Sequence, residues 1–190
     1  MNEVDYFSGD RFVAKMIIKL RDQFNIDTAI ETGSHIGCTS TWLSENFKQV
    51  YGIEVEQKHF DQAKINCSKI SNINFFLGDS RKILPKLLDE IKDRCLFFLD
   101  AHGYYDTPTS KELEIIAEHC KVKPIIVIHD FYNPNNPKLK FDTFYDFVYK
   151  WESIEKLVNQ IYGENFEYWY NNESEGDNVG VIYIVPKLPV

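Results

Sequence analysis

Long apolar runs are missing from this 190-residue sequence, in which no stretch approaches the roughly 18 apolar residues of a membrane-spanning helix. Residues 1–5 carry two acids and no apolar segment of the kind found in secretory signals. Basic residues are outnumbered, with 21 Lys and Arg against 29 Asp and Glu and a net charge of −8. Nucleic acids and anionic membranes are both bound through basic faces. We therefore expect a cytoplasmic protein with neither as a partner.

Paired cysteines are also missing. The four cysteines, Cys38, Cys67, Cys95 and Cys120, are far apart and form no C-x-x-C pair. Zinc sites and disulfide frameworks need closer or patterned spacing. We expect four buried thiols in a reducing compartment.

The remaining composition, 44% hydrophobic and 26% charged, is that of an ordinary globular domain. Apolar runs that are too short for buried helices alternate with segments of helical periodicity, which predicts a parallel sheet between helices. The strand-like runs are 26–32, 49–55, 73–77, 95–99 and 124–128, and the helical segments are 10–24, 39–47, 57–70, 80–92 and 109–120.

The pattern changes after an Asn/Pro-rich loop at 133–137. Apolar residues spaced by three and four predict a long helix over 142–162. Strands at 166–170 and 179–185 are close enough to pair antiparallel. The sequence therefore predicts a doubly wound, Rossmann-like sheet of seven strands in an α/β fold. Five of these strands are parallel, and a C-terminal hairpin follows them.

The first predicted strand ends in a glycine turn, Glu31-Thr-Gly33-Ser34-His35-Ile-Gly37. Its spacing, G-x-x-x-G, differs from the G-x-G-x-x-G of dinucleotide sites. Glu31 would repel a pyrophosphate but suits a cationic or amino-bearing ligand. The turn argues against NAD, although a ligand-free turn between strand and helix is equally compatible with it.

Two further acids follow neighbouring strands. Glu54 ends the second strand, 21 residues after Gly33, where a carboxylate can accept both hydroxyls of a ribose. Asp79 follows Gly78 at the end of the third strand and could accept from an adenine amino group, with Ser80 capping the next helix. The alternatives are a solvated acid at Glu54 and a simple helix cap at Asp79.

Together these motifs resemble those of class I S-adenosylmethionine-dependent methyltransferases over about residues 10–185. The stretches 31–41 and Phe98-Leu-Asp100-Ala-His102 are similar to the small-molecule O-methyltransferase branch, which includes sugar and natural-product enzymes. His35 replaces the middle glycine of the commoner first motif. The resemblance implies that the cofactor is held by Glu31, Gly33, Ser34, Gly37, Glu54, Asp79 and Ser80.

Polar residues follow the fourth and fifth strands, and the carboxyl ends of parallel strands meet at one edge. We expect Asp100, His102, His129 and Asp130 to converge there. In one mechanism His102 or Asp130 is the general base, and Asp100 supports the chemistry. In another, Asp100, His129 and Asp130 bind a divalent cation. The alternative is that one histidine merely caps a strand end.

We therefore expect methyl transfer from S-adenosylmethionine to a hydroxyl of a small molecule. The rival hypotheses are an NAD-dependent oxidoreductase and a non-catalytic protein that keeps a cofactor pocket. One domain is expected, with an N-terminal helix and lid at 1–25 and a cofactor-binding core at 26–185. The acceptor pocket must then come from 1–25, 101–109 and 131–141. Closing loops or a second subunit, as in a homodimer, would have to complete it.

Overall fold

The computed structural model describes residues 6–102, 108–144 and 147–188. The strands of the main sheet are β1 (Thr28–Thr32), β2 (Gln49–Glu54), β3 (Ile73–Leu77), β4 (Cys95–Leu99), β5 (Ile125–Ile128), β8 (Phe166–Tyr170) and β9 (Ile182–Pro186). The helices are α1 (Arg11–Phe24), α2 (Cys38–Asn46), α3 (Gln57–Asn66), α4 (Ser80–Glu90), α5 (Thr109–His119) and α6 (Trp151–Tyr162), preceded by a short turn segment, η1 (Tyr6–Gly9).

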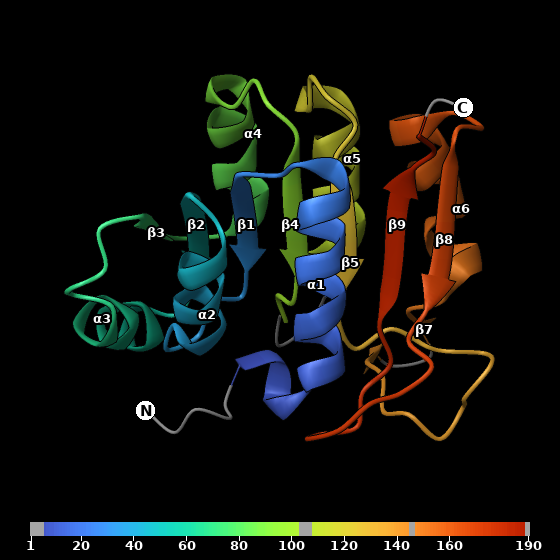
Figure 1. The fold of residues 1–190 in the computed structure, drawn as a ribbon, viewed down its shortest axis with the longest axis horizontal. Coiled ribbons are helices and arrows are strands. Elements are labelled where there is room, and N and C mark those ends of the chain that lie inside the picture. Colours follow the sequence, from blue (N-terminus) through green and yellow to red (C-terminus); the bar gives the residue numbers. More distant parts are fainter. Residues whose placement is uncertain (1–5, 103–107, 145–146, 189–190) are drawn as a thin grey trace.

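Within the described residues the seven strands form one sheet in the order β3-β2-β1-β4-β5-β9-β8 (Figure 1). The first five strands are parallel, and β9 is antiparallel to both β5 and β8. The predicted seven-stranded α/β fold with an antiparallel C-terminal hairpin is confirmed. Strand order reverses between β1 and β4, and ligands of open α/β sheets bind at such a point.

Both faces of the sheet are buried, as the apolar runs predict. Along β4, Leu96 and Phe98 pack toward α1 and α2, while Phe97 and Leu99 pack toward α4, α5 and α6. All four are at most 1% exposed. Burial of each such side chain contributes roughly 1.5–3 kcal/mol. Helix α1 belongs to this core, so within 1–25 only η1 is a described segment that could cover a site.

The predicted helix over 142–162 is wrong in its first half. Helix α6 begins at Trp151, after the short strands β6 (Thr143–Phe144) and β7 (Phe147–Val148), which pair antiparallel. The backbone N–H of Asp142 donates to the carbonyl oxygen of Asp130 at 2.8 Å, and Tyr149 accepts from Tyr132 at 2.8 Å. The carbonyl oxygen of Tyr149, which a helix over 142–162 would need for its own hydrogen bond, is therefore used in a tertiary contact. The N–H of Lys150 donates to Ser153 Oγ and so caps the shorter helix.

Other differences are small. Strand β9 begins at Ile182 rather than 179, because the side chain of Asn171 bonds the backbone of Val179 and Val181.

None of the helices in the described residues has the length and apolar character needed to cross a bilayer. The four cysteines all lie in described segments and form no disulfide; Cys67 and Cys95 are buried, and Cys38 and Cys120 are partly buried.

Candidate functional site

The turn after β1 requires its glycines. Gly33 has φ +80°, and a Cβ there would lie 2.3 Å from the carbonyl oxygen of Asp100 at the end of β4. Gly37 has φ +86° and begins α2. The N–H groups of Gly33 and Ser34 both donate to the carbonyl oxygen of Ile53. The turn is thus packed against the ends of the two strands that flank β1.

Glu54 lies directly beside this turn. Its carboxylate is 6% exposed and accepts from the N–H of His35 at 2.7 Å and from the N–H of Glu56 at 2.8 Å. His35, at the position of the missing glycine, has φ +47°. Each carboxylate oxygen keeps a second lone pair for a hydroxyl. The sequence placed Glu54 at the strand end, but its bond to the turn could be found only in three dimensions.

Glu31 is a buried acid on the face of β1 toward α2. It is 1% exposed, and the Ser40 hydroxyl donates to its Oε2. Burial raises the pKa of Glu31 to about 8, against the Ser40 hydrogen bond, and the charges of Asp100 and Glu54 act in the same direction as burial. At neutral pH the group is therefore largely protonated, and a cation placed beside it would favour its ionised form.

Asp79 acts as a helix cap. Its Oδ1 accepts from the N–H of Arg81 at 2.9 Å, and its Oδ2 accepts from Arg81 Nη2 at 2.8 Å. These Arg81 hydrogen bonds hold the pKa of Asp79 below its usual range. The predicted cap, Ser80, is instead the first residue of α4 and is buried, because Asp79 occupies the N-cap position. The predicted contact of Asp79 with adenine stays a prediction, and Arg81 is a partner that no sequence signal indicated.

A second buried acid, Glu112 of α5, lies behind these motifs and was not predicted. It is fully buried, and burial raises its pKa to about 7. The nearby hydroxyls of Ser80 and Thr32 lower the pKa of Glu112 and so act against burial, but neither forms a hydrogen bond of good geometry with its carboxylate. Among the described residues, both Glu112 carboxylate oxygens and Thr32 Oγ1 therefore remain without a hydrogen-bond partner.

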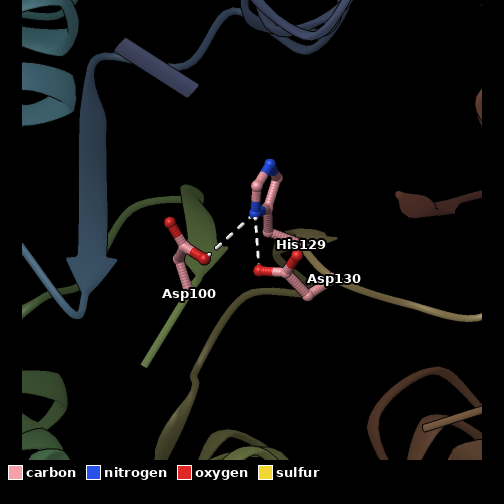
Figure 2. A group of neighbouring side chains, drawn as sticks. All are labelled: Asp100, His129 and Asp130. Carbon is pink, nitrogen blue, oxygen red and sulfur yellow. Dashed lines mark hydrogen bonds and ion pairs between the residues drawn. The ribbon is translucent and has the colours of Figure 1, made fainter. Parts of the chain in front are cut away.

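His129 lies between the two acids that end β4 and β5 (Figure 2). Its Nδ1 is 3.1 Å from Asp100 Oδ1 and 3.0 Å from Asp130 Oδ2, and its side chain is 1% exposed. Burial alone would lower the pKa of His129, but the two carboxylates raise it to about 10. Its Nε2 has no partner in the described part of the chain. The ring therefore bridges the two acids from the interior.

His102 contacts the same edge from its outer side. Its Nε2 lies 3.1 Å from Asp130 Oδ2 and 2.8 Å from Asp142 Oδ2. Hydrogen bonds to these carboxylates raise the pKa of His102 to about 11. Burial acts against ionisation of Asp130, but the two histidines hold its pKa well below its usual range. In this arrangement His102 donates a hydrogen bond, so a general base would be a carboxylate.

The predicted convergence of Asp100, His102, His129 and Asp130 is therefore present. Asp142 joins them and was missed, because the sequence pattern placed it at the start of a helix. The ligand atoms of Asp100, His129 and Asp130 lie within 4.8 Å of one another, as do those of His102, Asp130 and Asp142. Both groups have donor atoms close enough to hold one cation.

A cavity of about 580 Å³ opens beside this edge. It takes residues from η1 and from the predicted 131–141 loop, but also from the loop before β9, which was not predicted. Its lining includes Ser8, Asp130, Lys140, Phe141, Asp142 and Asp177. Of the predicted 101–109 segment, residues 103–107 lie outside the described residues.

Comparison with known sequences gives short matches. No protein-family model matches the chain. An uncharacterized RNA methyltransferase of Clostridium tetani is 34% identical over 56 residues, 28% of this chain and 12% of the relative. One of Oceanobacillus iheyensis is 26% identical over 113 residues, 57% of this chain and 23% of the relative. The chain thus spans less than a quarter of the length of these curated relatives.

Comparison with solved structures covers nearly the whole chain. The O-methyltransferase of Bacillus cereus in complex with SAH has a TM-score of 0.67 at 16% identity, covering 93% of this chain and 81% of that one. TomG of Streptomyces achromogenes, in complex with SAM, has a TM-score of 0.65 at 12% identity, covering 92% and 79%. An rRNA methylase of Streptococcus thermophilus has a TM-score of 0.59 at 16% identity, covering 92% and 95%. The chain has the fold of class I S-adenosylmethionine-dependent methyltransferases, as its motifs predicted.

Proposed function

We propose that this chain is an S-adenosylmethionine-dependent methyltransferase that acts on a hydroxyl of a small molecule. The observation that carries the proposal is the pair of buried acids, Glu31 and Glu54, on either side of the Gly33 turn. They end neighbouring strands of a methyltransferase fold, at the point where ligands of such sheets bind. The curated relatives, which are named methyltransferases, support the same activity.

The cofactor would lie along this edge. Its methionine end would face the turn of Gly33, Ser34 and Gly37, and its ammonium group would favour the ionised form of Glu31. Its ribose hydroxyls would donate to the free lone pairs of Glu54. Its adenine would reach Asp79 and Ser80. A bound dinucleotide, as in an oxidoreductase, would instead bring a pyrophosphate against Glu31, and its negative charge would oppose the ionised form of that acid.

Transfer is an in-line displacement that needs a well-placed nucleophile. The acceptor oxygen forms a bond to the methyl carbon while the carbon–sulfur bond breaks and its electron pair stays on sulfur. The hydroxyl proton passes to a carboxylate, for which Asp100 is the candidate. The two groups of His and Asp ligand atoms at this edge fit a divalent cation, which would hold the acceptor oxygen and lower its pKa.

A small acceptor is favoured by charge. The cavity beside the edge carries Asp130, Asp142 and Asp177 against Lys140, and the chain has a net charge of −8. An RNA acceptor would bring a phosphate chain to this acidic surface, where it would be repelled. The names of the curated relatives make RNA the alternative to test.

Calorimetry with S-adenosylhomocysteine tests the cofactor half of the proposal. The intact chain should bind it, and Glu54→Gln should bind at least about 10-fold more weakly, because hydrogen bonds to charged groups contribute about 1.5–3 kcal/mol. Glu90→Gln, an exposed acid at the end of α4, is the matched control and should bind as the intact chain does. Absence of binding by the intact chain, with tight NADH binding instead, would favour the oxidoreductase.

Labelled S-adenosylmethionine tests the acceptor half. Label should move to members of a panel of sugars and phenols and not to total RNA. Transfer to RNA alone would replace the small-molecule acceptor. Cofactor binding without transfer to any acceptor in either panel would favour the non-catalytic alternative.

A further inference from the structure

The His102, Asp130 and Asp142 cluster is a set of three ligands supplied by three separate segments. Asp130 follows β5, His102 follows β4, and Asp142 comes from the start of the β6–β7 ribbon. His102 Nε2 is 3.1 Å from Asp130 Oδ2 and 2.8 Å from Asp142 Oδ2. Donor atoms bound about 2.1 Å from one ion at right angles are about 3 Å apart. The two separations from His102 therefore match adjacent ligands on one metal ion, and the ligand atoms of all three residues lie within 4.8 Å of one another.

The backbone holds the two acids of this cluster in place. The N–H of Asp142 donates to the carbonyl oxygen of Asp130 at 2.8 Å. Asp130 itself has φ +55°, a left-handed and strained conformation that is uncommon for a residue with a side chain. The next residue, Phe131, is anchored by a bond of 2.8 Å from its N–H to Gly180. Strain of this kind persists where surrounding structure enforces it, often at functional sites.

Access distinguishes this cluster from the neighbouring Asp100–His129–Asp130 group. The side chain of His102 is 44% exposed and that of Asp142 is 31% exposed, whereas that of His129 is 1% exposed. An ion could reach His102 and Asp142 from solvent. In the other group it would have to enter the interior to reach the buried His129.

Resting on the proposed function, we propose that His102, Asp130 and Asp142 form the metal site of this enzyme, and that His129 positions Asp130 from behind without binding the ion. One imidazole and two carboxylates suit Mn²⁺, Fe²⁺, Co²⁺ or Zn²⁺ better than Mg²⁺ or Ca²⁺, which prefer oxygen ligands. Asp130 and Asp142 also line the cavity of about 580 Å³. An ion there would therefore face the space for the acceptor.

Cobalt titration of the chelator-treated full chain tests this site without any need for turnover. Visible absorption should show one Co²⁺ bound per chain. His102→Gln and Asp142→Asn should each weaken Co²⁺ binding at least about 10-fold and change the spectrum, because each removes a ligand. Asp177→Asn, which removes another acid of the same cavity, should bind Co²⁺ as the intact chain does. Circular dichroism checks that each variant is folded.

His129→Gln separates the two groups of ligands. It should retain Co²⁺ affinity within about threefold. Loss of binding in His129→Gln with normal binding in His102→Gln would place the ion at Asp100, His129 and Asp130 and overturn the proposal, as would no Co²⁺ binding by the intact chain. Parallel calorimetry with S-adenosylhomocysteine keeps failure of the cofactor proposal distinct, since Co²⁺ binding is measured without the cofactor.

Discussion

The carboxylate of Glu54 accepts a hydrogen bond of 2.7 Å from the backbone N–H of His35, so the acid that ends β2 holds the turn that follows β1. His35 stands where related motifs have glycine, and its φ of +47° is unusual for a residue with a side chain. The hydrogen bond from His35 to the Glu54 carboxylate offsets the conformational cost of this positive φ. The acid proposed to bind the ribose is thus also part of the scaffold of the turn.

Gly33→Ala should lower the free energy of unfolding by about 2–4 kcal/mol. The new Cβ would meet the carbonyl oxygen of Asp100 at 2.3 Å, in addition to the strain of φ +80°. Gly163→Ala is the matched control, since Gly163 has φ +66° but no atom within 4 Å of an added Cβ. Denaturant unfolding should show a smaller loss for the control, about 1–3 kcal/mol from its backbone conformation (φ +66°, ψ −138°) alone. Equal losses in the two variants would contradict the close approach of β1 and β4.

Glu31 should make stability fall as pH rises. Its pKa is about 8 in the folded chain against an ordinary value of 4.5, so the folded chain holds an extra proton between these values. Its contribution is complete below about pH 4.5 and lost as pH rises through about 8, with a slope of at most about 1.4 kcal/mol per pH unit. Unfolding measured from pH 5 to 8 should show a flatter profile for Glu31→Gln than for the intact chain.

Glu112 contributes in the same direction over a narrower range, because its pKa is about 7. The slopes of the Glu112→Gln and intact-chain profiles should differ mainly between about pH 4.5 and 7, with the intact chain losing stability over this range. The exposed Glu90→Gln should leave the profile unchanged. Coinciding profiles for the intact chain and Glu31→Gln would show that Glu31 is ionised in the folded protein.

Asp79 has one role that is visible and one that is proposed. Asp79→Asn keeps a cap for α4 and should cost less than about 1 kcal/mol of stability. If Asp79 accepts from the adenine amino group, the intact chain should prefer S-adenosylhomocysteine over its inosine analogue, which lacks that amino group, by about 10-fold or more. Calorimetry with Asp79→Asn should then show this preference much reduced. An intact chain that binds both ligands equally would restrict Asp79 to capping.

Gly180→Ala should disturb the edge that carries Asp130. A Cβ at Gly180 would lie 2.1 Å from the carbonyl oxygen of Phe131, whose N–H is bonded to Gly180. The segment after β5 would have to move, at a cost of roughly 1–3 kcal/mol. Thermal unfolding should show the loss of stability, and methyl transfer should fall further than stability alone explains. Unchanged transfer at full stability would mean that the contact is not needed.

The sequence by itself determined the sheet and most of the cofactor edge. Apolar runs such as Leu96–Leu99 are too short for buried helices and predict strands buried on both faces. Because parallel strands share their direction, acids or glycines at the ends of successive strands must meet at one edge of the sheet. The turn of Gly33, the acid Glu54 and the group of Asp100, His102, His129 and Asp130 follow from that rule alone.

Only the tertiary structure decided what these residues bond to. Periodicity cannot distinguish a helix over 142–150 from a ribbon whose backbone groups bond other segments, as Asp142 does with Asp130. Because the helix was predicted to begin at Asp142, the sequence pattern offered no reason to place this residue in the site, where it contacts His102. The partners of a histidine or a carboxylate depend on distances across the fold, and the cavity is a gap between loops that are far apart in the chain. Such contacts have no local signature, because they form only when the sheet has brought the strand ends together.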